Sequence, residues 1–307
     1  MPSKPISVGI HVPSASVAPL GSGADYAEFF RQVEALGLDA VWTEDRLFHR
    51  ANMLDSILLL TWAAASTRRI QLGTAVLVLN LRHAAVVARQ VSSLQHLAGG
   101  RLALGVSLGG RPNEYQSLGV PMEKRVTVFR ESLAVLRQLL AGQPVDYQGR
   151  LLRLQDATVR PAATLPIYIG GRAEGALRRA GELGDGWIMG PFGPVEDFQH
   201  AWPVVQDAAR AAGKDPATLV AGRLLYVAVD EERHRARATL QHFLHGYYGA
   251  AFDVDQHAIF GPPEEVAARL RVQVQAGITH LMLGVPTLDL THLRRVAEEV
   301  APALRRI

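Results

Sequence analysis

Two consecutive glycines followed by an arginine form the strongest chemical signal in the sequence. Gly170, Gly171 and Arg172 stand in the run LPIYIGGRAEGALRR, between a short apolar strand and a helical pattern. Glycines at such a turn let backbone N–H groups approach an anion closely, the following helix adds its positive N-terminal end, and arginine supplies a fork of donors. This pattern predicts a phosphate site; an ordinary turn between a strand and a helix is the alternative.

Two histidines and an acidic residue follow other predicted strands. His11 ends the first strand, and Asp45 and His49 follow the second. Histidine titrates near neutral pH, and a neighbouring carboxylate can share its proton, so both residue types suit acid–base catalysis. We therefore take His11, His49 and Asp45 as candidate catalytic residues. The alternatives are hydrogen-bonded structural histidines and a salt bridge between Asp45 and Arg46.

The composition excludes several kinds of chemistry. The chain has no cysteine, which removes disulfides, catalytic thiols, iron–sulfur clusters and thiolate zinc sites. It has no HExxH spacing and no P-loop lysine, so we expect neither a metal site nor nucleotide triphosphatase chemistry. With 32 basic and 29 acidic residues the net charge is only +3, which argues against a nucleic-acid partner.

The distribution of apolar residues indicates no membrane segment. The opening run MPSKPISVGIHV is broken by Ser7, Gly9 and His11 and does not resemble a signal peptide. No stretch approaches the ~20 apolar residues of a transmembrane helix. We therefore expect a cytoplasmic enzyme that does not bind membranes.

Short apolar runs alternate with longer segments of helical period along the whole chain. This alternation predicts a mainly parallel sheet with helical crossovers. The predicted strands are Ile6–Val12, Ala40–Thr43, Ile70–Leu79, Leu102–Val106, Pro166–Ile169, Gly186–Met189, Val220–Val229 and His280–Val285. The predicted helices are Ala24–Leu36, Leu54–Ala65, Ala84–Leu97, Lys124–Leu140, Glu174–Leu183, Val195–Ala212, an irregular helical region running to Ala276, and Leu288–Arg305.

Eight such repeats fit a closed (β/α)8 TIM barrel better than an open, doubly wound sheet. The rhythm breaks once, after the fourth helix, where Pro144–Pro161 reads as two alternating segments around Gln148 and Gly149. This pattern predicts an inserted hairpin. Because no linker or charge run divides the chain, residues 1–307 are expected to form a single domain. In such a barrel the ligand site lies at the C-terminal ends of the strands.

Two long segments resemble the bacterial-luciferase-like superfamily. The first begins RIQLGTAVLVLNLRHAAVVARQ and continues through GVSLGGRPNEYQSLGV to Leu140; the second is LPIYIGGRAEGALRRAGELGDGWIMG. The closing run EEVAARLRVQVQAGITHLMLGV resembles the last barrel unit of the same superfamily. Its members are flavin-dependent monooxygenases and oxidoreductases, together with relatives that use the deazaflavin coenzyme F420. The resemblance implies a (β/α)8 barrel with an insertion after the fourth helix.

The resemblance also implies a set of cofactor-binding residues. At Thr74, Ala75 and Val76 the family often forms a non-prolyl cis peptide beneath the flavin ring. Asp45 matches an acidic position near the ring edge. Ser107 and Asn113 match positions that contact the ring or its side chain, and the loop of Gly170, Gly171 and Arg172 matches the family's phosphate loop.

Two departures from the family pattern bear on the choice of cofactor. The deazaflavin-dependent dehydrogenases of the family usually have histidine where this chain has Arg46, and some have glutamate where it has Gly110. Both groups serve proton transfer in those enzymes. The sequence therefore favours reduced FMN, with a monooxygenase reaction of O2 on a small organic substrate.

Two alternatives stay open at this stage. The chain could transfer hydride with coenzyme F420 in place of FMN, or it could be a flavin-binding protein without catalytic activity. The FMN hypothesis also predicts a separate flavin reductase as the source of reduced cofactor. A homodimer is expected, because family members often dimerise through helices near the second and third strands and the apolar helix at 54–65 permits this.

Overall fold

Residues 5–305, the part of the chain that the computed structural model describes, form a parallel sheet closed into a barrel. Eight strands make the ring, and the pairing of β10 with β11 closes it. In ring order they are β10 (Gly186–Met189), β9 (Ile167–Gly170), β6 (Leu102–Ser107), β5 (Gln71–Val78), β3 (Ala40–Thr43), β1 (Ser7–His11), β13 (His280–Gly284) and β11 (Val220–Val229). The predicted (β/α)8 barrel is confirmed.

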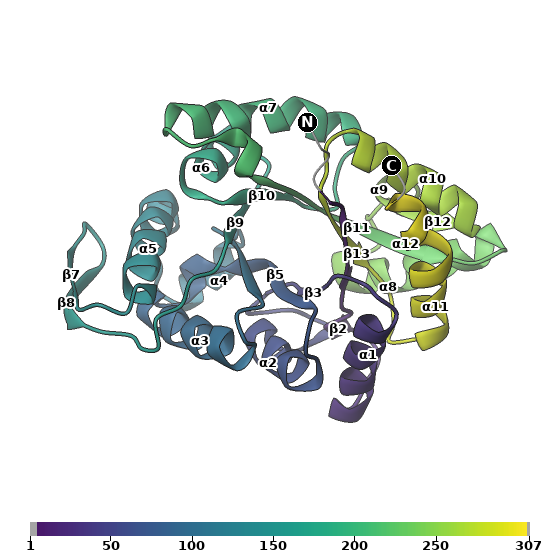
Figure 1. Cartoon of the computed structure of the whole chain (residues 1–307), viewed down its shortest axis with the longest axis horizontal. Coiled ribbons are helices and arrows are strands. Elements are labelled where there is room, and N and C mark those ends of the chain that lie inside the picture. Colours follow the sequence, from purple (N-terminus) through teal and green to yellow (C-terminus); the bar gives the residue numbers. More distant parts are fainter. Residues whose placement is uncertain (1–4, 306–307) are drawn as a thin grey trace.

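Helices surround the strands as an outer layer (Figure 1). Side-chain caps fix where several of them begin; Asp55, for example, accepts the backbone N–H groups of Ile57 and Leu58. The longer helices are α1 (Gly23–Ala35), α2 (Ser56–Ser66), α3 (Ala84–Leu97), α5 (Arg125–Leu140), α6 (Glu174–Leu183), α7 (Val195–Ala211), α8 (Arg233–Tyr248) and α10 (Pro263–Gln275). Within residues 5–305, no helix combines the length and apolar character that a bilayer span requires.

Short elements connect these units. They are η1 (Leu79–Leu81), α4 (Pro112–Ser117), η2 (Met122–Lys124), η3 (Pro216–Thr218) and α9 (Val254–His257), with a small antiparallel sheet of β2 (Ala15–Ser16) and β4 (Asn52–Met53). This small sheet joins the loops that follow β1 and β3, so it lies beside the C-terminal ends of the barrel strands.

The barrel interior is filled by side chains, and Trp42 occupies much of it. Trp42 is fully buried, and its indole ring lies over Gly9 and Gly73 on the two neighbouring strands. A Cβ at Gly73 would lie 2.2 Å from the ring, and one at Gly9 would lie 2.6 Å from it. These two glycines therefore make the space that the large side chain of β3 requires.

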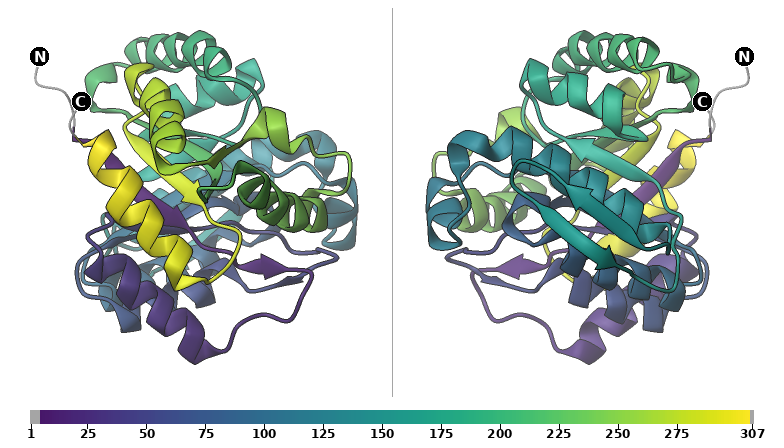
Figure 2. Two further views of the ribbon diagram at one scale, coloured as in Figure 1. Left: turned by 90° about the vertical axis from the view of Figure 1, so that its right-hand side faces the viewer. Right: turned by 90° about the vertical axis from the view of Figure 1, so that its left-hand side faces the viewer.

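The inserted hairpin also forms where the sequence predicts it. Strands β7 (Val145–Gln148) and β8 (Arg153–Ala157) pair antiparallel beyond the outer layer, next to α5 (Figures 1 and 2). Glu131 of α5 accepts the backbone N–H groups of Arg150, Leu151 and Leu152, at 2.7–2.9 Å. This single carboxylate attaches the tip of the hairpin to the barrel, because it satisfies three donors that the turn leaves without partners.

The structure differs from the sequence-based prediction in the last third of the chain. The region predicted as irregular helix up to Ala276 contains a strand, β12 (Ala258–Gly261), which pairs with the C-terminal half of β11 and gives the sheet a ninth member. The predicted C-terminal helix at 288–305 consists of α11 (Leu290–Arg295), the π-helix η4 (Val296–Val300) and α12 (Ala301–Leu304). Elsewhere the predicted boundaries are correct to within two or three residues.

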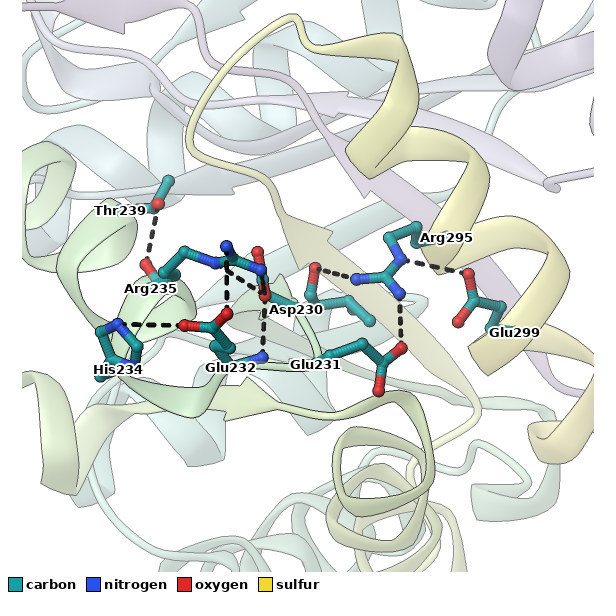
Figure 3. Close-up of polar contacts among 9 residues, drawn as sticks. Asp230, Glu231, Glu232, His234, Arg235, Thr239, Arg295 and Glu299 are labelled. Carbon is teal, nitrogen blue, oxygen red and sulfur yellow. Dashed lines mark hydrogen bonds and ion pairs between the residues drawn. The ribbon is translucent and has the colours of Figure 1, made fainter.

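A network of charged side chains attaches the start of α8 to the end of β11 (Figure 3). Asp230, the first residue after β11, pairs with Arg235 at 3.0 Å, and Glu232 pairs with both His234 and Arg235. On the other side Arg295 pairs with Glu231 at 2.5 Å and with Glu299 at 3.2 Å. Most of these side chains are exposed, so each pair contributes little free energy on its own; together they fix the point at which α8 leaves the barrel.

His292 of α11 is expected to make the fold sensitive to acid. Its Nε2 accepts the backbone N–H of Val229 at 2.9 Å, and burial lowers the pKa of the imidazole to about 4. Because the folded pKa lies below the ordinary value of about 6.5, the unfolded chain takes up the proton first as the pH falls. Stability is therefore lost from about pH 6.5 down to about pH 4, by at most about 3 kcal/mol, and the loss levels off below that.

Denaturant unfolding of the wild type and of His292→Gln at several pH values tests this expectation. The wild type should lose more free energy of unfolding than the variant between pH 6.5 and 4. Parallel pH profiles for the two proteins would show that another group is responsible.

Candidate active site

A cleft of about 550 Å³ opens at the C-terminal ends of the barrel strands. Its lining comes from the ends of β5, β6, β9 and β10, from the middle of β11, from the first turn of α5 and the first two turns of α6, and from the loop after β3. The lining residues are Arg46, Ala75, Val76, Ser107, Leu108, Gly109, Arg125, Val126, Gly170, Gly171, Arg172, Ala173, Gly175, Ala176, Arg179, Ile188, Gly190 and Leu224. The cleft lies at the end of the barrel where ligands of this fold are expected.

The floor of the cleft is a bulge near the end of β5. The peptide bond between Ala75 and Val76 is cis, as the family resemblance predicts, and the register with β6 shifts between Thr74 and Leu77. Ala75 and Val76 line the cleft, whereas Thr74 is buried below them and donates its hydroxyl to the Gly105 carbonyl at 2.7 Å. A Cβ at Gly170 would lie only 3.1 Å from the Val76 side chain. The floor therefore remains flat and apolar.

One end of the cleft is built for an anion. Gly171 has φ +148°, and a Cβ there would lie 2.6 Å from the Cβ of Ala176, so the loop admits only glycine without rearrangement. Trp187 Nε1 donates to the Gly171 carbonyl at 2.8 Å and holds the loop in place. Beyond the loop, the backbone enters α6, where the Ala176 and Leu177 N–H groups donate to the Ala173 carbonyl. No side chain caps this helix end, so the N–H groups of Glu174 and Gly175 are the ones that remain available to a ligand.

Arginines surround this end of the cleft. Arg125, Arg172 and Arg179 line the cleft together with Arg46. The Nε atom of Arg179 is buried and donates to no protein acceptor in the described structure. Burial, followed by the neighbouring Arg130 and Arg125, lowers the pKa of Arg179. An anionic ligand would stabilise this half-buried guanidinium beside Arg130 and Arg125, and it would also satisfy the free Nε donor.

Arg172, the third residue of the predicted phosphate loop, is less enclosed. The guanidinium of Arg172 lies 6.0 Å from the centre of the Phe192 ring and 3.5 Å from the Asp197 carboxylate, and about half of its side chain is exposed. Arg172 therefore lines the cleft from an exposed position.

A second polar cluster lies in the mouth of the barrel, around Glu44. The Glu44 carboxylate lies 2.9 Å from His11 Nε2 and accepts the Ser14 hydroxyl at 2.7 Å. Although burial acts to raise it, the pKa of Glu44 is lowered overall, because His11 and Ser14 stabilise the carboxylate. Glu44 is therefore a charged, largely enclosed group with a histidine as its immediate partner. His11 itself is almost completely buried.

Three tyrosines complete what we call the Glu44 cluster: His11, Ser14, Glu44, Tyr226, Tyr247 and Tyr248. The hydroxyls of Tyr226 and Tyr248 lie 2.9 Å apart. Burial and the nearby Glu44 charge raise the pKa values of all three phenols, that of Tyr248 to about 12. The tyrosines therefore remain protonated at neutral pH and can donate a proton or a hydrogen bond. Tyr247 and Tyr248, at the end of α8, lie more than 190 residues from Glu44 in the sequence, so only the fold brings them together.

Arg46 joins the cleft to the Glu44 cluster. It lines the cleft and interacts with Tyr247, Tyr248 and Glu114. Burial acts to lower the pKa of Arg46, but these partners raise it overall, so the guanidinium stays charged. In the sequence, Arg46 is a departure from the family pattern and a candidate partner of Asp45; in the structure it lines the cleft, and Asp45 pairs with Arg82 instead.

Other predicted site residues have structural partners. Asp45 accepts the backbone N–H of Val78 at 3.0 Å and Arg82 at 2.9 Å, and Arg82 also reaches Asp55. Asp45 is buried against these groups and lies outside the cleft lining. It thus attaches the end of β3 to the end of β5. A catalytic role for Asp45 remains a prediction.

His49 and Asn113 lie farther from the cleft, and Ser107 lies within it. The His49 ring stacks on Tyr247 with 4.6 Å between centroids; its Nδ1 accepts the Ala51 N–H, and its Nε2 faces the Tyr247 carbonyl at 3.1 Å. This leaves His49 as a link between a loop and α8. Asn113 is exposed on α4 and does not line the cleft, whereas Ser107 lines it at the end of β6. The predicted roles of His49, Asn113 and Ser107 remain predictions.

Comparison with known proteins assigns the family. The model of the luciferase-like monooxygenase family matches residues 6–253, and the chain belongs to this family. Among curated relatives, the F420-dependent glucose-6-phosphate dehydrogenase of Kineococcus radiotolerans is 30% identical over 98% of both chains. The 5,10-methylenetetrahydromethanopterin reductase of Methanolobus tindarius is 27% identical over 85% of this chain and 90% of its own. The protein is therefore an oxidoreductase enzyme of the luciferase-like family.

Solved structures agree on the fold. An F420-dependent secondary alcohol dehydrogenase in complex with an F420-acetone adduct superimposes with a TM-score of 0.86, at 22% identity and over 98% of this chain and 100% of its own. A Pseudomonas putida Baeyer-Villiger monooxygenase in complex with FMN gives a TM-score of 0.79, at 18% identity over 97% and 98% of the two chains. At 22% and 18% identity these two similarities support the fold alone. The choice of cofactor therefore depends on the curated relatives and on the cleft.

Proposed function

We propose that this enzyme transfers hydride between coenzyme F420 and a small alcohol or carbonyl substrate. The observation that carries the proposal is the cleft, which has four lining arginines and, among the described residues, no lining carboxylate. Coenzyme F420 is a deazaflavin with a phosphodiester and an acidic glutamate tail, so it presents several negative charges to such a lining. The curated relatives at 27–30% identity that are named for F420 dependence or for methylenetetrahydromethanopterin reduction support this choice over the FMN reaction that the sequence favoured.

The shape of the cleft fits the cofactor. The bulge at Ala75–Val76 with Ile188 and Leu224 would hold the flat ring system, and the loop of Gly170 and Gly171 with Arg179 and the first turn of α6 would hold the phosphate. Glycine is required at both loop positions by close packing. A Cβ at Gly170 would lie 3.1 Å from the Val76 side chain, and a Cβ at Gly171 would lie 2.6 Å from that of Ala176. When bound, the deazaflavin accepts or donates a hydride at its ring.

The Glu44 cluster would handle the proton of the reaction. Reduction of a carbonyl to an alcohol takes up one hydride and one proton, and oxidation of the alcohol releases both. Tyr248 is a protonated phenol that can donate to the substrate oxygen, and the pair of Glu44 and His11 can resupply or accept that proton across the cluster. Arg46, charged and close to the tyrosines, would stabilise negative charge on the oxygen. The histidine that Arg46 replaces is therefore not needed for proton transfer.

Titration of the purified enzyme with each cofactor tests the proposal. Calorimetry should give at least about tenfold tighter binding for F420 than for FMN, because the extra anionic groups of F420 meet the arginine lining. Tighter binding of FMN would contradict the proposal and return the FMN monooxygenase to first place. In the direction of carbonyl reduction, a separate enzyme that supplies reduced F420 would take the place of the predicted flavin reductase; alcohol oxidation needs none.

We also propose that the enzyme forms a homodimer through α2. This helix is rich in apolar residues along its whole length. The exposed fraction is 71% for Leu58 and 47% for Trp62, and Val86 of α3 is exposed as well. Such a face is typical of a contact between subunits. Replacing Leu58 with aspartate should convert the dimer to a monomer in analytical ultracentrifugation. A wild-type monomer at micromolar concentration would refute this proposal.

A further inference from the structure

A second pocket of about 490 Å³ has no lining residue in common with the cleft, and nothing in the proposed cofactor site accounts for it. It is bounded by α8, by the small sheet of β2 and β4, and by the loop after β13. We call it the α8 pocket. Small apolar side chains such as Ala15, Ala18 and Ala238 leave its space open, and the rings of Phe243 and Tyr247 form its inner wall.

The lining of the α8 pocket contrasts with that of the cleft in charge. Within residues 5–305, no aspartate, glutamate, lysine or arginine lines it; its polar groups are hydroxyls of residues such as Thr239 and the imidazole of His242. A phosphate or carboxylate bound there would lose its hydration without gaining a cationic partner, and this costs free energy. An uncharged, mainly apolar molecule would gain from burial and could still make one or two hydrogen bonds.

The inner wall of the α8 pocket is shared with the Glu44 cluster. Tyr247 lines the pocket, and the same side chain interacts with Arg46, which lines the cofactor cleft. Tyr248, the proposed proton donor, is the next residue, with its ring 4.7 Å from that of Tyr247. Among the lining residues, Tyr247 is therefore the member of the Glu44 cluster that a molecule in the α8 pocket would contact, and it connects the pocket to Arg46 of the cleft.

We propose that the α8 pocket holds the apolar body of an uncharged alcohol or ketone substrate, with the substrate oxygen at the Tyr247 end. This inference rests on the proposed function. In the oxidation direction the carbinol C–H bond breaks and its electron pair leaves as hydride to oxidised F420. The O–H proton passes to the Glu44 cluster, and the C–O bond becomes a carbonyl. A sugar phosphate, the substrate in the printed name of one relative, does not suit this pocket.

Fluorescence of N-phenyl-1-naphthylamine, an uncharged apolar probe, tests the pocket in the protein without cofactor. One probe should bind per chain, and cyclohexanol should displace it while glucose 6-phosphate does not. The variant Ala238→Trp fills the mouth of the pocket from an exposed helix position and should weaken probe binding at least about tenfold. Ala18→Trp, on the opposite wall, should act in the same way.

The control is Ala211→Trp, at the exposed end of α7 and away from both cavities, which should leave probe binding unchanged. Probe binding that neither pocket variant weakens, or displacement by glucose 6-phosphate, would overturn the inference. Turnover measurements distinguish a failure of this inference from a failure of the proposed function. Oxidation of glucose 6-phosphate with F420 but not of cyclohexanol keeps the function and overturns the inference. Probe binding without any F420-linked oxidation overturns the proposed function and the substrate role of the pocket together.

Discussion

Replacing Arg179 with methionine should weaken cofactor binding about 10- to 100-fold without lowering the free energy of unfolding of the cofactor-free enzyme. The guanidinium lies in the cleft with a buried Nε that no protein acceptor satisfies in the described structure, close to the positive charges of Arg125 and Arg130. Its removal therefore relieves repulsion in the empty protein, and methionine retains most of the apolar packing of the side chain.

The adjacent Arg178 provides a matched control. It is exposed on the same helix and pairs with Glu174 one turn earlier, at 2.6 Å. Arg178→Met should leave cofactor affinity unchanged and change stability by less than about 0.5 kcal/mol. Calorimetric titration with F420 and denaturant unfolding measure both effects. A loss of stability in Arg179→Met with unchanged affinity would mean that Arg179 is a structural residue and that the anion binds elsewhere.

Replacing Glu44 with glutamine should reduce the turnover number by about 10²- to 10⁴-fold, with cofactor affinity nearly unchanged. The substitution keeps the size of the side chain and removes the charge that faces His11. It thereby removes the group that would exchange a proton with His11 and the tyrosines. Glu44 does not line the cleft, which is why binding should be retained.

The pH dependence of the remaining activity gives a second readout. The Glu44 charge contributes to the raised pKa values of Tyr247 and Tyr248. Without it both pKa values should fall, so the alkaline limb of the rate profile should move to lower pH, although burial keeps the pKa values above the ordinary 10. Glu264→Gln, at an exposed position of α10, should leave the profile unchanged. Full activity of Glu44→Gln with an unmoved profile would exclude Glu44 from the reaction.

Much of the fold could be predicted because it follows from local patterns. The alternation of apolar strands and amphipathic helices indicates the barrel, and Gln148 with Gly149 between two alternating segments indicates the hairpin. Strand β12 could not be predicted, because it lies within a stretch of helical pattern and is followed at once by Pro262 and Pro263, which indicate only an interruption of a helix. Its extended conformation depends on pairing with β11, which is a tertiary contact.

The candidate site could be predicted only where it is local in sequence. Gly170, Gly171 and Arg172 form one turn, so their spacing indicates an anion site before the fold is known. The cluster around Glu44 gave no such signal, because its tyrosines come from β11 and the end of α8. Asp45 was the more conspicuous carboxylate in the sequence, yet its nearest partners are Arg82 and a backbone N–H. Adjacent carboxylates on a strand end point in opposite directions, and only the fold shows which one faces the barrel mouth.

The central claim is hydride transfer with F420, and anaerobic turnover with a deuterium-labelled substrate tests it most directly. The enzyme is mixed with oxidised F420 and a panel of secondary alcohols that carry deuterium on the carbinol carbon, in the absence of oxygen. We expect ketone to form in step with reduced F420, with the deuterium found on the deazaflavin ring. Turnover that requires oxygen and reduced FMN, with no deuterium on F420, would contradict the account.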